Sequence, residues 1–162
     1  MDLSVVRVAS PVGWWSVLGD AGGVREITMP HEVGLAESLR VAGPVREAAR
    51  QLEQYFAGRR RTFSVALADV AATDFQRAVW EALDEIPYGS VATYAEVAAM
   101  VGRPRAARAV GNANHANPWP LLHPCHRVVA AQGLGGYGGG EEVKRFLLDL
   151  EGVEDYTSSD TR

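Results

Sequence analysis

The sequence changes character near residue 70, and this change limits what the chain can fold into. The segments before it are short, rich in β-forming residues and separated by Gly and Pro: Val5 to Val8, Trp14 to Leu18 and Val24 to Met29. Such segments predict a small antiparallel sheet. The segments after it have apolar residues at helical spacing behind helix-capping signals. We therefore predict an α+β protein, with an N-terminal supporting domain of sheet and helix over residues 1–70 and a helical C-terminal domain over residues 71–162.

One helix is expected in the first half of the chain. Apolar residues recur at helical spacing from Pro44 to Phe56, and Gly58 follows as a helix-ending residue. The basic run Arg59-Arg60-Arg61 comes next, and we interpret it as a solvated turn rather than a phosphate contact. The segment from Thr62 to Leu67 is predicted to form a further strand.

Two capping boxes mark helix starts in the second half. Thr73 with Gln76, and Thr93 with Glu96, have the spacing at which each side chain accepts a hydrogen bond from the other residue's backbone N–H. The sequence therefore predicts helices that begin directly after Thr73 and Thr93. A last amphipathic helix is expected from Val143 to Leu150.

The second capping box opens a helix-turn-helix pattern over residues 93–114. Its first helix is predicted to end near Gly102, and Pro104 suits the first position of the next helix. Any pair of short helices shows a similar pattern, but the charges add to it. The formal net charge of the chain is -4, yet residues 97–140 contain no acidic residue and several basic ones, among them Arg103, Arg105, Arg108 and Arg127. We expect a basic face on an otherwise acidic protein.

The chain has a single cysteine, Cys125, which excludes an intrachain disulfide and a zinc site built on several thiolates. A lone cysteine is most often a small buried apolar residue. Here His126 and Arg127 place a base and a cation beside it, and such neighbours favour the nucleophilic thiolate. On an extended strand, adjacent side chains point to opposite faces. A bend or a water molecule is therefore needed to connect His126 to Cys125.

Two other kinds of site fit the sequence poorly. A zinc site fails because Cys125 and His126 are adjacent and no second thiol exists. The glycine-rich segment over residues 133–140 lacks the Lys-Ser/Thr ending of a phosphate-binding loop. We interpret it as a turned or mobile loop that lets a ligand approach the backbone. We predict no metal and no cofactor.

An ordered set of short motifs runs through the second half of the chain, and this set resembles the 6-O-alkylguanine-DNA alkyltransferase family over about residues 73–152. The motifs are Phe75-Gln76, Val79-Trp80, Ile86-Pro87-Tyr88-Gly89, Thr93-Tyr94, Ala106-Ala107-Arg108-Ala109-Val110-Gly111, Asn117-Pro118, Pro124-Cys125-His126-Arg127-Val128, Gly136-Tyr137 and Glu151-Gly152. The resemblance implies DNA repair by direct damage reversal: a single-turnover transfer of the alkyl group from 6-O-methylguanine, or a larger 6-O-alkylguanine, in duplex DNA to Cys125. The alkylated base must first be flipped out of the stack.

The resemblance also assigns catalytic roles. Cys125 attacks the alkyl carbon and keeps the group as a thioether, His126 acts through a water as the base for the thiol, and Glu151 orients the imidazole. Tyr94 donates a proton or a hydrogen bond to the departing guanine. Asn117 joins the two halves of the site through hydrogen bonds.

We expect the C-terminal domain to be winged-helix-like, and the resemblance further implies that the second helix of its helix-turn-helix binds the DNA minor groove. Arg108 is then the finger that fills the gap left by the flipped base. Small neighbours let the helix approach the groove, and the remaining residues of the DNA-binding set are Thr93, Ala106, Ala107, Ala109 and Gly111. The pocket for the alkylated base is lined by Arg127, Gly135, Gly136, Tyr137, Gly138 and Gly139.

Four features depart from the family pattern. His123 stands where the family usually has an aliphatic residue, and the glycine loop looks one residue shorter than in many relatives. Gly138 replaces a serine of some members, so a backbone amide would substitute for a side-chain donor. The zinc ligands found near the N-terminus of some relatives are absent, which agrees with the prediction of no metal.

Two alternatives come from other functional classes. A lesion-recognition module without chemistry would lack the nucleophile, so Cys125 argues against it. A cysteine hydrolase or thiol transferase for small molecules would not need the helix-turn-helix in its acid-free window. The partner we expect is double-stranded DNA, bound by a monomer, with cooperative binding left open and no membrane involved. The N-terminus has no basic segment followed by an apolar block, so we expect a cytoplasmic protein.

Overall fold

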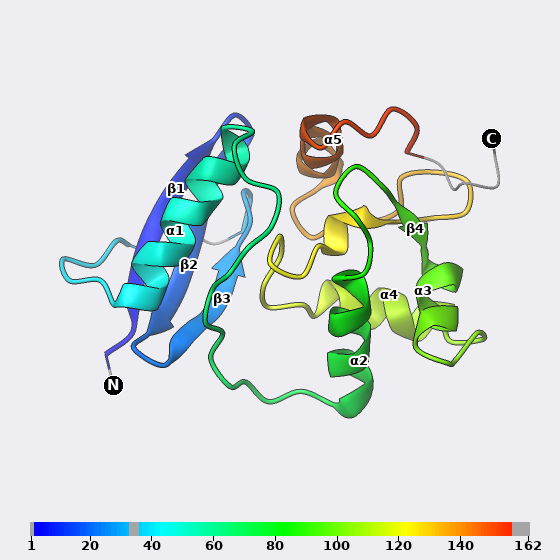
Figure 1. Ribbon diagram of the computed structural model, residues 1–162, viewed down its shortest axis with the longest axis horizontal. Coiled ribbons are helices and arrows are strands. Elements are labelled where there is room, and N and C mark those ends of the chain that lie inside the picture. The colour runs from blue at the N-terminus through cyan, green and yellow to red at the C-terminus, as the bar shows by residue number, and fades with distance from the viewer. Residues whose placement is uncertain (1, 33–35, 157–162) are drawn as a thin grey trace. The chain divides into compact units, whose positions relative to one another are not determined.

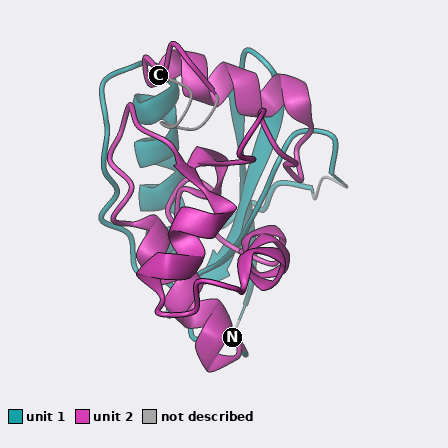
Figure 2. Cartoon of the chain, turned by 90° about the vertical axis from the view of Figure 1, so that its right-hand side faces the viewer, with its two compact units in different colours: residues 1–71 teal, residues 72–162 magenta. Residues whose placement is uncertain are grey.

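A computed structural model describes residues 2–32 and 36–156 of the chain. The chain divides into two compact units, Met1–Ala71 and Ala72–Arg162 (Figure 2). The predicted α+β class is confirmed: a small antiparallel sheet lies in the first unit, and the second unit is mainly helical. No helix in the described part of the chain has the length and apolar character needed to cross a membrane.

The first unit is a three-stranded sheet with one helix packed on it (Figure 1). Strands β1 (Ser4–Ser10), β2 (Gly13–Asp20) and β3 (Gly23–Thr28) pair antiparallel in sequence order. Helix α1 (Gly43–Phe56) contacts all three strands. Alternate strand residues and the apolar face of α1 form the core, in which Trp15, Val17, Leu52 and Tyr55 are fully buried.

The strand predicted from Thr62 to Leu67 is wrong. Within the described residues this segment pairs only at an isolated bridge, between Leu67 and Val24. The backbone N–H of Ser64 instead donates to the Gln51 side chain at 2.9 Å, so a side chain takes the place of a neighbouring strand. Arg60 donates to Gln54 at 2.7 Å and to the Thr62 carbonyl at 3.0 Å, and these bonds hold the basic run in its turn.

The second unit contains helices α2 (Asp74–Leu83), α3 (Tyr94–Met100), α4 (Ala107–His115) and α5 (Glu141–Leu150). Helices α2, α3 and α4 pack on one another (Figure 1). A short 3-10 helix, η1 (Cys125–Arg127), leads into strand β5 (Val128–Val129), which pairs parallel with β4 (Ala92–Thr93). This pairing fixes the segment after Cys125 to the start of α3.

Both predicted capping boxes are confirmed. Thr73 and Thr93 are the N-caps of α2 and α3, and each hydroxyl accepts the N3 backbone N–H at 3.0 Å. The reciprocal bonds run from the Thr73 and Thr93 backbone N–H groups to Gln76 and Glu96, at 2.9 and 2.8 Å. Local sequence therefore fixes where these helices begin.

The start predicted for the next helix is wrong, because α4 begins at Ala107 rather than at Pro104. Gly102 ends α3 with φ +75°, and Arg103 N donates back to the Ala98 carbonyl at 2.9 Å. This is the hydrogen bond of a Schellman motif. A second turn then follows, closed by the bond from Ala106 N to the Arg103 carbonyl at 2.9 Å. Pro104 lies inside that turn, so the helix begins only after it.

Candidate active site

The candidate nucleophile lies in a tight turn. Cys125, His126 and Arg127 form η1, in which Arg127 N donates to the Pro124 carbonyl at 3.1 Å. All three side chains are buried, and Cys125 is only 2% exposed. The structure thus supplies the bend that the sequence required, since Cys125 and His126 do not stand on an extended strand.

The surroundings of Cys125 keep its thiol protonated at rest. Burial raises the pKa of Cys125 above its usual range. Hydrogen bonds from Asn117 and Tyr137 and the positive charge of Lys144 act in the opposite direction, because they stabilise a thiolate. A base must therefore take the thiol proton before or during attack, and the developing thiolate then meets stabilising groups.

A buried network surrounds Glu151, the residue that caps the end of α5, and His126, the candidate base, belongs to it. His126 Nε2 lies 2.7 Å from Glu151 Oε2, and Arg127 donates to both carboxylate oxygens, at 2.8 and 3.1 Å. Burial alone would raise the pKa of Glu151, but the electrostatic interactions and hydrogen bonds with His126 and Arg127 lower it to about 2. His126 acts through its charge only at the low pH where Glu151 titrates, because burial lowers the pKa of His126 itself. Glu151 is therefore ionised.

The ionised Glu151 determines how His126 holds its proton. Burial lowers the pKa of His126, and Glu151 offsets this only in part, so the imidazole is neutral at neutral pH. A carboxylate can only accept a hydrogen bond, so the proton of His126 resides on Nε2. Nδ1 keeps its lone pair, and no described residue bonds to this buried atom. His126 is set up to accept a proton at Nδ1.

Arg127 is directed at the network rather than at a ligand. Its third nitrogen, Nη1, donates to the Ile86 carbonyl at 2.7 Å, so all three guanidinium nitrogens are used within the protein. In the structure Arg127 supports Glu151, and its predicted place in the pocket for the alkylated base stays a prediction.

Tyr94 lies between α4 and the glycine loop. A side chain at Gly135, where φ is +78°, would place its Cβ 3.0 Å from the Tyr94 hydroxyl, and a Cβ at Gly111 would touch the Tyr94 ring at 3.8 Å. Gly135 therefore leaves room for the phenol, whereas a Cβ at Gly111 would make only an ordinary van der Waals contact with the ring. Burial raises the pKa of Tyr94, and the nearby Cys125 adds to this rise, while a hydrogen bond from the Gly136 backbone lowers it. Tyr94 is a protonated donor close to Cys125.

Asn117 connects the end of α4 to the chain before Cys125. Its Nδ2 donates to the His123 carbonyl at 2.8 Å, and its Oδ1 accepts the Trp119 backbone N–H at 3.0 Å. With its hydrogen bond to the Cys125 thiol, Asn117 spans the whole turn that leads to the nucleophile.

Two residues near Cys125 were missed by the sequence reasoning. Lys144 is fully buried on α5, where its Nζ donates to the Val128 carbonyl at 2.6 Å and to the Gly136 carbonyl at 3.1 Å. Burial lowers the pKa of Lys144 to about 8. Asn114, buried on α4, donates from Nδ2 to the Cys125 carbonyl at 3.1 Å. The available signal was a polar residue on the apolar face of each helix.

The residues predicted to bind DNA lie in and around α4. Arg108 and Ala109 are exposed, and Ala106 and Ala107 are partly exposed. Thr93 differs from them, because it is 5% exposed and its hydroxyl caps α3. In the glycine loop, Gly138 is exposed and Gly139 is buried, while the Gly136 carbonyl is held by Lys144.

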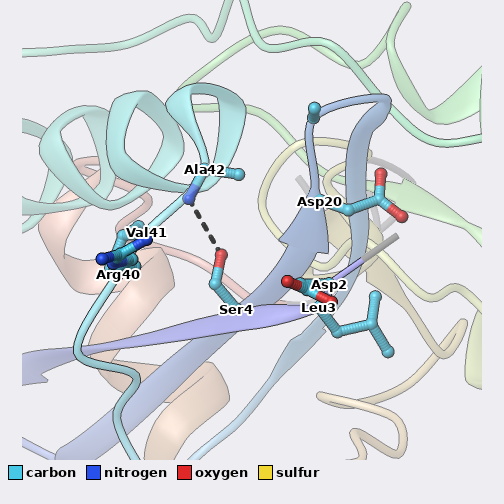
Figure 3. Close-up of a pocket in the computed structure, with 8 residues that line it drawn as sticks. Asp2, Leu3, Ser4, Asp20, Arg40, Val41 and Ala42 are labelled. Atoms are coloured by element: carbon cyan, nitrogen blue, oxygen red, sulfur yellow. Dashed lines mark hydrogen bonds between the residues drawn. The ribbon is translucent and has the colours of Figure 1, made fainter.

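A cavity of about 360 Å³ in the first unit contains none of the predicted site residues (Figure 3). Two of its polar side chains are already bonded: Ser4 Oγ accepts the Ala42 N–H at 3.0 Å, and Asp20 Oδ1 accepts the Gly22 N–H at 2.8 Å.

Comparison with known proteins agrees with this geometry. The model of the 6-O-methylguanine DNA methyltransferase DNA-binding domain matches residues 74–153. The methylated-DNA–protein-cysteine methyltransferase of Methanosarcina acetivorans is 56% identical over 148 residues, which cover 88% of this chain and 94% of that protein. The enzyme of the same name from Mycobacterium leprae is 47% identical over 147 residues, covering 90% of this chain and 87% of that protein. The crystal structure of Mycobacterium tuberculosis OGT in complex with DNA superposes with a TM-score of 0.80 at 40% identity, covering 97% of this chain and 96% of that one.

Proposed function

The chain belongs to the 6-O-methylguanine DNA methyltransferase family, and from this premise we propose how its residues carry out the reaction. It is a DNA-repair enzyme that transfers a methyl group from methylated DNA to a cysteine of its own. Cys125 is the acceptor. The observation that carries this assignment is the buried relay in which Glu151 holds Nε2 of a neutral His126 at 2.7 Å and leaves Nδ1 free for the thiol proton.

The transfer is a displacement at the alkyl carbon. The Cys125 sulfur forms a bond to this carbon while the bond from carbon to the guanine 6-oxygen breaks. The thiol proton passes to His126 Nδ1 through a water, and Glu151 stabilises the imidazolium that forms. Negative charge develops on the departing guanine, and Tyr94, which stays protonated, donates a hydrogen bond or a proton to it. The thioether is stable, so each molecule reacts once.

The position of Cys125 requires the damaged base to leave the helix. Cys125 is only 2% exposed, so a base stacked in duplex DNA cannot reach its thiol. Flipping the nucleotide out solves this problem. Arg108, exposed on α4, fills the gap in the stack, and the small residues beside it let α4 enter the minor groove as a monomer. The lining glycines and Tyr137 receive the base.

The direct test is intact-protein mass spectrometry after incubation with a duplex that carries one 6-O-methylguanine. We expect a gain of one methylene, located in the peptide that contains Cys125, and no further gain with excess DNA. Binding selective for the lesion but without a mass gain would instead indicate a recognition module without chemistry. A gain on another peptide would disprove the role of Cys125.

Arg108→Ala is expected to slow repair of duplex DNA at least about tenfold, because an inserted side chain stabilises the unstacked state by a few kcal/mol. Reaction with free 6-O-benzylguanine should be unchanged, since a free base needs no extrusion. The two rates can be measured as single-turnover time courses of Cys125 alkylation. His115→Gln, at the exposed C-terminal end of α4 and outside the residues assigned to DNA, is a matched control on the same helix. Equal losses on both substrates would contradict the finger role.

A further inference from the structure

The segment between Asn117 and Cys125 is held in a strained shape. Leu121 has a φ of +76°, a conformation that a residue with a branched side chain rarely adopts. Such strain persists only where surrounding contacts enforce it. Within the segment, His123 N donates to the Trp119 carbonyl at 2.9 Å, which closes the turn around Leu121.

Trp80 of α2 and Asp84, the residue that caps the C-terminal end of this helix, both contact the turn. The ring of Trp80 meets the ring of Trp119 edge-on at 5.9 Å, and Asp84 Oδ1 lies 2.8 Å from His123 Nδ1. Trp80 is itself fixed, since its Nε1 donates to the Ala113 carbonyl of α4 at 2.8 Å. The His123 ring also meets Trp119 edge-on at 5.7 Å. Asp84 still has helical backbone angles, so its spacing of four residues from Trp80 brings both side chains to the same side, where each contacts one end of the turn.

The backbone links His123 directly to the nucleophile. The His123 carbonyl accepts a hydrogen bond from Cys125 N at 2.7 Å and another from Asn117 Nδ2 at 2.8 Å. A rotation of residue 123 therefore moves the peptide that orients Cys125. The His123 side chain is 14% exposed and that of Asp84 48% exposed, so the contact couples a nearly buried ring to the surface end of α2.

We propose that Asp84 and His123 form a clasp that positions Cys125 for attack on the alkyl carbon. This proposal depends on the proposed function in one respect only: it assumes that Cys125 is the alkyl acceptor. Neither residue touches substrate; both are positioning residues, which act through the His123 carbonyl. An aliphatic residue at position 123 would fill the same space but could not bond to Asp84, so the clasp is a property of this chain.

The test compares the full-length protein with His123→Leu, Asp84→Ala and the double variant, using free 6-O-benzylguanine. The rate of Cys125 alkylation is followed by intact mass over a range of substrate concentrations. Each single variant should lower the maximal rate about tenfold, because displacement is sensitive to misplacement of the nucleophile, and leave the half-saturating concentration unchanged within about twofold. The double variant should be no slower than either single variant, because both remove the same contact.

His123→Gln provides the rescue, since its amide donates to Asp84 without the imidazole, and it should recover most of the rate. Glu141→Gln, which removes an exposed ion pair to Arg145 on α5, is the matched control and should react like the wild type. Losses that multiply in the double variant, an unchanged maximal rate or a shift only in half-saturation would each overturn the clasp. Unfolding of His123→Leu would leave Asp84→Ala and His123→Gln to decide. Labelling of a Cys125→Ser protein would instead overturn the proposed acceptor.

Discussion

Cys125→Ser is expected to abolish alkyl transfer, with a rate lower by on the order of 10⁶-fold, since removal of a nucleophile costs this much in enzymes with a comparable relay. The two side chains are nearly equal in size. The difference lies in the proton: a serine hydroxyl loses it far less readily than a thiol, so the hydroxyl is a much weaker nucleophile at neutral pH. Intact mass after incubation with a methylated duplex would show no gain.

Binding of the same duplex should survive the Cys125→Ser substitution. The thiol is 2% exposed and lies in η1, whereas the exposed residues assigned to DNA, Arg108 and Ala109, are on α4. Fluorescence anisotropy with methylated and unmethylated duplexes would measure the affinity, and His115→Gln on the exposed face of α4 is a control for the binding assay. A mass gain in the serine variant would place the acceptor elsewhere, and a loss of lesion binding would show that the thiol helps to recognise the base.

The sequence predicted those parts of the fold that depend on local hydrogen bonds. The boxes at Thr73 and Thr93 each hold two reciprocal bonds within four residues, so their outcome needs no tertiary information. The strand predicted from Thr62 to Leu67 was wrong because the side chain of Gln51, on the preceding helix, accepts a hydrogen bond from the backbone N–H of Ser64. The prediction that a helix begins at Pro104 was wrong because proline suits both the first position of a helix and a turn.

In the candidate site too, the sequence indicated the residues within motifs but not those brought in by tertiary contacts. Motif order indicated Cys125, His126 and Glu151, and the structure brings His126 and Glu151 to 2.7 Å. Lys144 and Asp84 were not predicted. A lysine on an amphipathic helix usually lies in solvent. Only the fold shows that two backbone carbonyls accept hydrogen bonds from the buried Lys144. The bond between Asp84 and His123 joins residues 39 apart in the chain, and no local pattern specifies such a pair.

Glu151 should also contribute strongly to the stability of the second unit at neutral pH. Its side chain is fully buried between His126 and Arg127. A carboxyl whose pKa falls from an ordinary 4.5 to about 2 on folding contributes about 3 kcal/mol to the free energy of unfolding. Removing its charge also leaves Arg127 buried without an anionic partner, a change that costs about 3–5 kcal/mol in other proteins.

Glu151→Gln should therefore lower the free energy of unfolding by about 3 kcal/mol at pH 7. A lowered pKa gives stability that is complete above the unfolded value of 4.5 and is lost as the pH falls toward about 2. The difference between wild type and variant should thus be constant above about pH 5 and shrink steadily between pH 4.5 and 2. Urea unfolding followed by tryptophan fluorescence at pH 7 and at about pH 3 would measure both values. Glu141→Gln, at an exposed pair with Arg145, should change stability by less than about 1 kcal/mol at either pH. A difference for Glu151→Gln that stayed the same at both pH values would mean that the ionised carboxylate is not what holds His126 and Arg127 in place.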